Sequence, residues 1–389
     1  MHPLDRKTGA AEYHTIAATG LMPATRRQMM ALLGLAIPAS LLGSGSARAA
    51  GPLAPVAEKD AVIAFGHIGP ISDGGWTLTH HRALLAVKAA FPAAKYLEVE
   101  SIPVSADATR TFRQFVENGA NIVFVTSEYG DLLGTVAEDA DQVAFLECNG
   151  HMKTDNVGFY YMRHWMVSYI LGVAAGQLSK TGKFGFVGSL PVPAVYACAN
   201  AFMMGVRSIN PKATLQVILI NSWFDPQAAS QAASALIQNG VDLIYTNLDD
   251  GSVLTVAEKS GIRAVTWNTD MRAAGPNAYV SSLMLDWNAF CVGQVGKRLK
   301  GEWSGGTATL LPVGGGVDRD AWGARVPPEV GAKADLVRKR IIDGSFNPFT
   351  GEIRDTAGVV RIKAGEPMTD AALYDWDWPV EGVSGLKLR

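Results

Sequence analysis

Short apolar runs alternate with helix-like segments along most of the chain. The runs have the length and composition of strands that are buried on both faces of a parallel sheet. The expected strands lie at 62–65, 96–100, 143–147, 184–187, 216–220 and 264–268. The expected helices run from 76 to about 90, from about 108, from about 195 to 206 and from 227 to 238.

Two stretches of the chain repeat one another. Residues 118–126 read NGANIVFVT and residues 239–247 read NGVDLIYTN. In both, an amphipathic helix ends at Asn-Gly, a common helix stop, and an apolar strand-like run follows. Each run leads to a second helix that contains Val-Ala-Glu, at 136–138 and 256–258. The repeat predicts two similar units built on the same plan.

Alternating strands and helices predict the fold class, which is α/β. Such alternation produces right-handed crossovers and parallel sheets covered by helices on both faces. We therefore expect two doubly wound, Rossmann-like lobes. Ligands bind beyond the carboxyl ends of the strands in such sheets, so two facing lobes would share one cleft and close on a hinge.

The first residues have the features of an export signal. Arg26 and Arg27 precede an apolar run at 29–42, and Ala47-Arg48-Ala49 resembles a signal-peptidase site. The run is short for a membrane span, which needs about 20 apolar residues. The paired arginines predict a twin-arginine signal over 1–49 and a periplasmic location. A buried core helix is the alternative. No cysteine follows the cleavage site closely, so we expect a soluble protein without a lipid anchor.

Composition narrows the classes of function. The net charge is −2 at pH 7 and 48% of the residues are hydrophobic, which suits two ordinary domains. No basic cluster is present, which argues against nucleic acid as a partner. The three cysteines (Cys148, Cys198 and Cys291) form no Cys-x-x-Cys motif, so we expect buried thiols and neither zinc nor redox chemistry.

Three motifs resemble one known family. They are GPISDGGWT at 69–77, KTGKFGFVG at 180–188 and NSWFDP at 221–226. In order and spacing they resemble the basic membrane protein (Bmp/Med) family, over roughly 61–303. Its members are substrate-binding components of ABC importers and include purine nucleoside receptors. The resemblance implies a type I periplasmic-binding-protein fold with three interlobe crossings, a purine-related ligand and an ABC permease at the inner membrane as partner. We expect a monomer.

With that fold, the lobes are expected to divide the chain at the crossings. Lobe one would hold 50–157 and about 271–305, and lobe two would hold 158–270 and about 306–389. At 281–287 the chain reads SSLMLDW, where nucleoside receptors of the family carry a lysine. This Asp-Trp version resembles a subgroup for bare nucleobases, so a base such as adenine is favoured over a nucleoside.

Aromatic residues at strand ends are the candidates for stacking on a flat ligand. Trp76 follows Gly74-Gly75, where glycines let backbone approach a ligand closely. Packing within its own lobe is the alternative. Trp223 follows the strand at 216–220 and is expected on the opposite ring face. Phe224 is expected beneath its loop, and Asp225 before Pro226 is expected to cap a helix.

Polar residues at the strand ends are candidates to read the edge of the ligand. The candidates are Asp73, Gly75, Ser127, Glu128, Tyr129, Asn247, Asn268, Asp270 and Asp286, with Asp249 beside them. An ordinary loop role is the alternative for each. Asp73 suits a turn, Asn268 and Asp270 suit the hinge, and Asp286 suits a helix N-cap equally well.

Enzyme motifs are missing from the expected mature chain. No G-x-S-x-G, phosphate-binding loop or H-E-x-x-H appears, and adjacent His80 and His81 would point about 100° apart on a helix. His67, His151 and His164 are isolated, as expected for structural residues. A binding protein without catalytic residues, metal or cofactor is therefore expected. The alternatives are a purine nucleoside hydrolase, a binding protein for a non-purine ligand, or a sugar-repressor-like regulator, which the export signal disfavours.

Overall fold

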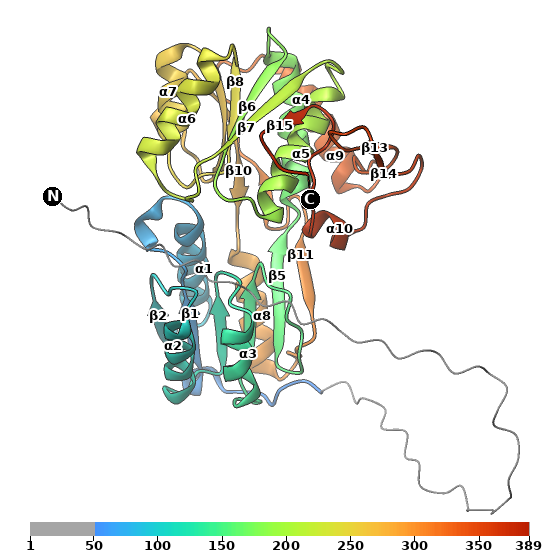
Figure 1. The fold of residues 1–389 in the computed structure, drawn as a ribbon. Helices are drawn as coiled ribbons and strands as arrows, with labels where there is room; N and C mark the ends of the chain where they lie inside the picture. The colour runs from blue at the N-terminus through green and yellow to red at the C-terminus, as the bar shows by residue number, and fades with distance from the viewer. Residues whose placement is uncertain (1–50, 389) are drawn as a thin grey trace, which may run out of the picture. The chain divides into compact units, whose positions relative to one another are not determined.

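The computed structural model describes residues 51–388 of the chain (Figure 1). The expected export signal at 1–49 lies outside the described residues. Within 51–388, no helix combines the length and the apolar character needed to cross a membrane. The described residues, 51–388, belong to one compact unit.

A sheet of six parallel strands is the centre of lobe one. Its strands are β1 (Val62–Gly66), β2 (Lys95–Val99), β3 (Ile122–Val125), β4 (Ala144–Cys148), β5 (Val157–Met162) and β11 (Ala308–Leu311), in the order β11-β5-β4-β3-β1-β2. Its helices are α1 (Trp76–Ala90), α2 (Ala106–Glu117), α3 (Asp131–Glu138) and α8 (Asn288–Lys300). α1 packs with α8 and α2 packs with α3, so that helices cover both faces of the sheet.

A seven-stranded sheet is the centre of lobe two. Its strands are β6 (Lys183–Gly188), β7 (Thr214–Leu219), β8 (Leu243–Thr246), β9 (Arg263–Asn268), β10 (Tyr279–Leu285), β12 (Val317–Arg319) and β15 (Val383–Ser384), in the order β12-β10-β9-β8-β6-β7-β15. Only β12 is antiparallel to its neighbour. The helices are α4 (His164–Leu178), α5 (Pro193–Arg207), α6 (Pro226–Gln238), α7 (Ser252–Ser260), α9 (Pro328–Ile342) and α10 (Asp370–Tyr374).

The internal repeat corresponds to a repeat in topology. Five strands of lobe one run β2-β1-β3-β4-β5 across the sheet, and five strands of lobe two run β7-β6-β8-β9-β10 in the same pattern. The repeated motifs form β3 and β8, and both strands are fully buried. The predicted α/β class with two doubly wound lobes is therefore confirmed.

Three crossings join the lobes, but the expected lobe boundaries are wrong at each of them. The chain leaves lobe one after β5, returns after β10 and leaves again after β11. β5 was expected in lobe two from residue 158, but it pairs with β4 of lobe one. β10 was expected in lobe one, yet it pairs with β9, and β11 pairs with β5 rather than with lobe two. Pairing with strands that are distant in the sequence decides which of the two sheets a strand next to a crossing joins. A short apolar run predicts a strand but not its partner.

The sequence patterns also missed α4, the helix that follows β5. It is buried on nearly all sides, so it lacks the amphipathic period that identifies a surface helix. α4 and α5 approach each other closely at two glycines. A Cβ atom on Gly172 would lie 2.2 Å from the Phe202 carbonyl oxygen, and one on Gly205 would lie 2.2 Å from that of Tyr169. This tight pair forms much of the core of lobe two.

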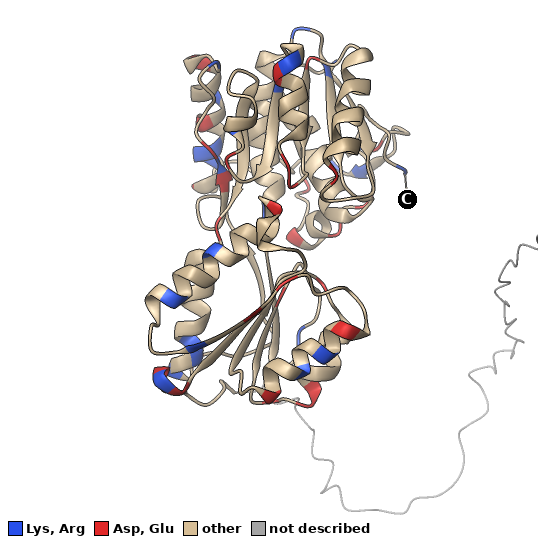
Figure 2. Ribbon diagram, turned by 90° about the vertical axis from the view of Figure 1, so that its left-hand side faces the viewer, with Lys and Arg blue, Asp and Glu red and all other residues tan. Residues whose placement is uncertain are grey.

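The surface charge and the burial of the cysteines are as the composition of the chain predicts. Lys and Arg are interspersed with Asp and Glu over the helices of both lobes (Figure 2). The three cysteines are free and buried, as expected.

Candidate ligand-binding site

A cavity of about 360 Å³ lies where the carboxyl ends of the two sets of strands face each other. Its volume falls in the range of about 300–1,000 Å³ that is usual for small-molecule sites. The aromatic residues in its wall are Trp76, Tyr161, Trp223, Phe224 and Trp267. The polar residues in its wall include Asp73, Thr77, Ser127, Asn149, Ser222, Asn247, Asp249 and Asn268. An apolar chamber with a few polar groups of this kind suits a small organic ligand.

Trp76 forms the lobe-one side of the cavity. It is the first residue of α1, and its indole Nε1–H donates to the carbonyl oxygen of Thr126 at 2.7 Å. Its ring meets Trp287 edge-on, with centroids 5.7 Å apart, and lies 6.2 Å from the ring of Tyr161. These contacts fix the orientation of the indole while part of it stays exposed to the cavity.

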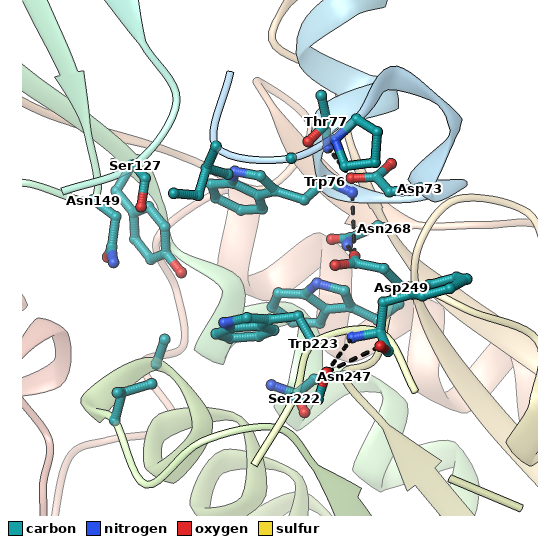
Figure 3. A pocket seen from close by; sticks show the side chains of 18 residues that line it. Asp73, Trp76, Thr77, Ser127, Asn149, Ser222, Trp223, Asn247, Asp249 and Asn268 are labelled. Carbon is teal, nitrogen blue, oxygen red and sulfur yellow. Dashed lines mark hydrogen bonds between the residues drawn. The ribbon is translucent and has the colours of Figure 1, made fainter. Parts of the chain in front are cut away.

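Trp223 forms the lobe-two side, in the loop between β7 and α6 (Figure 3). Its side chain is 38% exposed, and its carbonyl oxygen accepts from the Asp249 N–H at 3.0 Å. In Figure 3 the indoles of Trp76 and Trp223 lie on opposite sides of the pocket. Phe224 was expected beneath the loop, but it is 54% exposed and lines the cavity, so that expectation is wrong. Asp225 caps α6 by accepting from Ala228 N–H, as expected.

Asp249 is the most perturbed acidic group of the cavity. Its side chain belongs to the loop after β8, and its Oδ1 accepts from the backbone N–H of Trp76 at 3.2 Å and from Nδ2 of Asn268. Burial, together with the negative charge of Asp73, raises the pKa of Asp249 to about 8. The hydrogen bonds favour the ionised form but do not offset burial. Asp249 is therefore poised to be neutral near pH 7 unless a ligand donates to it.

Two buried oxygen atoms of the wall have no hydrogen-bond partner among the described residues. They are Oδ1 of Asn268 and Oγ1 of Thr77. Asn268 is 1% exposed and has a φ of 67°, in the left-handed region that a residue other than glycine adopts at a cost. A buried, unpaired acceptor costs about 1–3 kcal/mol. A ligand with N–H donors would satisfy the Asn268 acceptor.

Two hydrogen bonds join the lobes at this site. Asp249 of lobe two accepts from Trp76 N–H of lobe one, and the Thr269 hydroxyl donates to the Gly74 carbonyl oxygen at 2.8 Å. The first contact requires glycine at position 75, because a Cβ atom there would lie 2.3 Å from Asp249 Oδ1. The described arrangement is therefore one in which the lobes meet over the cavity.

Seven of the residues proposed from the sequence lie in the cavity wall. They are Asp73, Trp76, Ser127, Trp223, Asn247, Asp249 and Asn268. Asp73 also takes the turn role that was its alternative, since its carboxylate accepts from the N–H groups of Gly75, Thr77 and Leu78. Gly75 is not in the wall, but it permits the interlobe contact.

The other proposed residues have different surroundings. Glu128 points to His151, at 2.9 Å, and the hydroxyl of Tyr129 donates to Ile102 within lobe one. Asp270 pairs with Arg272. Asp286 accepts from Asn288 N–H at the start of α8 and lines a second cavity rather than this one. These four follow strand ends in sequence, but their loops turn the side chains away from the cavity.

Sequence reasoning missed several wall residues. Tyr161 and Trp267 lie inside β5 and β9, where an aromatic residue in an apolar run looks like core. Asn149 follows β4 with a φ of 58°, a conformation that Asn adopts more readily than most residues. Its place directly after a buried strand is the only sequence feature that could have identified Asn149 as a wall residue.

Two of the histidines that might suggest metal or acid–base chemistry, His80 and His164, are buried and have packing roles. The His80 ring stacks on Trp287 at 4.7 Å, and burial lowers its pKa to about 3. Burial likewise lowers the pKa of His164 to about 4. Within residues 51–388, no cluster of three or more His, Cys, Asp or Glu side chains is placed to hold a metal ion.

The chain is similar in sequence to substrate-binding proteins of ABC transporters. A family model described as "ABC transporter substrate-binding protein PnrA-like" matches residues 61–317. A purine-binding protein of Brucella abortus is 33% identical over 329 residues, which cover 84% of this chain and 94% of that protein. A putative ABC transporter glucose-binding protein of Haloferax volcanii is 30% identical over 294 residues, which cover 74% of each chain.

Solved structures share the architecture. An ABC transporter solute-binding protein from Conexibacter woesei has a TM-score of 0.61 at 22% identity, over 74% of this chain and 98% of that one. A solute-binding protein of an ABC transporter from Aeropyrum pernix has a TM-score of 0.60 at 15% identity, over 82% and 95% of the two chains. At these identities the likeness concerns the fold, which is that of type I periplasmic-binding proteins.

Proposed function

Because the chain belongs to the PnrA-like family of ABC transporter substrate-binding proteins, we propose that it captures a purine base, with adenine favoured over a nucleoside. The observation that carries the proposal is the cavity itself. Two indoles, Trp76 and Trp223, lie on opposite sides of it, and a polar edge lies near Asp249 and Asn268. The 33% identical relative from Brucella abortus is named for purine binding, which supports the same ligand class.

The aromatic walls suit a flat heterocycle. Base–aromatic stacking contributes about 1–3 kcal/mol per base, and every purine presents two π-faces. In our proposal the ligand first stacks on Trp76, whose ring is already oriented by Thr126. Closure then brings Trp223 over the other face and buries the ring system.

The polar edge suits a ligand that donates hydrogen bonds. Asn268 Oδ1 accepts only, and it is buried without a partner among the described residues. The exocyclic amino group and the ring N–H of adenine are donors of the required kind. Hydrogen bonding to such a donor would also favour the ionised form of Asp249 and replace the proton that burial otherwise imposes.

The charge of the wall supports a base over a phosphorylated ligand. Among the described residues that line the cavity, none is Lys or Arg, while Asp73 and Asp249 are acidic. A phosphate would meet two carboxyl groups and no cation. The Asp-Trp pair at 286–287 lies outside the cavity wall. The acidic wall does not discriminate against an uncharged nucleoside, so the preference for a base over a nucleoside rests on the missing lysine alone.

A neutral sugar is the second candidate ligand. Aromatic walls also bind sugars, and the 30% identical relative from Haloferax volcanii is named as a putative glucose-binding protein. The family consists of substrate-binding proteins, and we propose that this chain likewise has no catalytic activity. We further propose that it acts as a monomer in the periplasm after twin-arginine export and delivers its ligand to an ABC permease.

A thermal-shift screen of residues 50–389 tests the ligand assignment. A ligand that binds only the folded state raises the melting temperature by mass action. We expect adenine to raise it and adenosine, adenosine monophosphate and glucose to leave it near the ligand-free value. A shift with adenosine but not with adenine would refute the base preference. A shift with glucose alone would refute the purine assignment.

Substitution of Gly75 tests whether ligand capture requires the lobes to meet. In Gly75→Ala, the new Cβ atom would clash with the Asp249 carboxyl group and hold the lobes apart. Overpacking of this kind costs about 1–3 kcal/mol, so adenine binding should weaken about tenfold or more. Gly293→Ala is the matched control, because nothing lies within 4 Å of its new Cβ atom. Equal affinities in both variants, measured by calorimetry, would contradict the interlobe role.

A further inference from the structure

The carboxyl-terminal segment lies beyond the part of the chain that matches the family. The match ends at residue 317, and the segment from 318 includes α10 and the strand β15. Figure 1 shows α10 at the level where the two lobes meet. The transport function proposed above gives this segment no role.

The segment is anchored in lobe two. β15 adds to the sheet beside β7, and the buried side chain of Asn200 on α5 holds the chain just after α10. Asn200 Nδ2 donates to the Trp378 carbonyl oxygen at 2.8 Å, and Val380 N–H donates to Asn200 Oδ1 at 3.0 Å. Trp376 is 1% exposed and packs edge-on against Phe349.

The same segment also contacts lobe one, through Tyr374 and Asp375. The Tyr374 hydroxyl donates to the Gly150 carbonyl oxygen at 2.8 Å, and its ring packs against Phe159 of β5. A carboxylate oxygen of Asp375 lies 3.0 Å from Nε2 of His151. Both contacts reach the loop between β4 and β5, which also supplies Asn149 to the cavity wall.

We propose that α10 is an interlobe clasp in which Tyr374 and Asp375 position the cavity wall and hold the two lobes in their closed arrangement. The clasp acts on the cavity through two residues. Tyr374 meets the ring of Tyr161 edge-on, with centroids 5.6 Å apart, and Tyr161 lines the cavity. The hydrogen bond to Gly150 fixes the residue next to Asn149. Opening of the lobes must break these contacts or carry α10 away from lobe two.

His151 makes the clasp sensitive to pH. Its ring nitrogens face Glu128 at 2.9 Å and Asp375 at 3.0 Å, the ring of Tyr374 lies 5.1 Å away, and buried Glu147 is also close enough to interact with its charge. Partial burial lowers the pKa of His151, but the hydrogen bonds that its ring N–H groups donate to the two carboxylates outweigh this effect and leave the pKa raised. The raised pKa means that protonation strengthens the clasp. It is strongest where His151 is protonated and both carboxylates are ionised, and it weakens as the pH rises through the pKa of His151.

Distance measurements between spin labels test the clasp. Labels at Ala106→Cys and Gln227→Cys would report closure, since α2 and α6 begin on opposite sides of the cleft and both positions are exposed. The native cysteines are buried and should not be labelled. We expect Tyr374→Phe combined with Asp375→Asn to lengthen the label-to-label distance without ligand. The same variant should weaken adenine binding about two- to tenfold.

Glu381→Gln is the matched control. It removes the same charge from the same segment, but Glu381 pairs with Arg207 inside lobe two. Distances that stay unchanged in both variants, or that lengthen equally in both, would overturn the clasp. His151→Gln should remove part of the pH dependence of the distance, while the part that comes from Asp249 remains. Identical pH profiles in the parent and His151→Gln would overturn the role of His151.

The clasp proposal rests on the proposed function only in the part of its test that uses adenine. If adenine leaves the parent distance unchanged while Tyr374→Phe with Asp375→Asn lengthens it, the clasp stands and the ligand assignment fails. If adenine shortens the parent distance and the clasp variant behaves like the parent throughout, the ligand assignment stands and the clasp fails.

Discussion

Trp76→Ala is expected to weaken adenine binding by about 1–3 kcal/mol, which is roughly 5- to 150-fold in Kd. The substitution removes the lobe-one stacking face, which other contacts hold in one orientation. Calorimetric titration of adenine into residues 50–389 would measure the change. Trp76→Phe keeps an aromatic face and should recover most of the lost affinity.

The control for Trp76 separates stacking from a general loss of packing. Trp322 is partly buried and packs against Arg319, outside the cavity wall. Trp322→Ala should lower the melting temperature without a matching loss of adenine affinity. If Trp76→Ala binds adenine as tightly as the parent, the stacking arrangement is wrong.

Asp249→Asn is expected to remove most of the pH dependence of lobe closure in the ligand-free protein. In the closed arrangement the pKa of Asp249 is raised to about 8, whereas an open cleft would return it toward the ordinary 3.8. Closure therefore takes up a proton between about pH 4 and pH 8. Its equilibrium constant should fall by up to about tenfold per pH unit as the pH rises through that window. Asn keeps an oxygen acceptor for Trp76 N–H but does not titrate.

Small-angle scattering at pH 5, 7 and 9 would measure this effect. The ligand-free parent should show a larger radius of gyration at pH 9 than at pH 5, because the ionised carboxyl group disfavours the closed arrangement beside Asp73. Asp249→Asn should show a smaller change, due mainly to His151. Superimposable pH profiles for the two proteins would contradict the assignment to Asp249.

The fold could be predicted where local sequence carries the information. The six strands expected from apolar runs begin within two residues of observed strands, and the Asn-Gly repeats identify β3 and β8 as equivalent. Lobe membership of β5, β10 and β11 could not be predicted in the same way. These strands flank the crossings, and only their non-local pairing shows which sheet they join.

Cavity residues could be predicted from the sequence where they lie in the connection between the end of a strand and the start of the next helix. Trp76 and Trp223 stand at such points, and both lie in the cavity wall. Asp286 stands at a similar point, but its loop faces a different cavity, and Trp267 lies within a strand that reads as core. The direction of a loop side chain depends on backbone conformation, as the left-handed Asn149 and Asn268 illustrate. The spacing of residues in the sequence does not determine the direction in which such a side chain points.

Calorimetric titration of adenine into the parent protein, after any co-purified ligand has been removed by unfolding and refolding, is the decisive test of whether the cavity binds a purine base. We expect saturable binding at one site, with a negative heat-capacity change from burial of apolar surface. Adenosine titrated in the same way should bind more weakly than adenine. If adenine gives no heat of binding with protein that does bind glucose or another non-purine, the purine assignment is wrong.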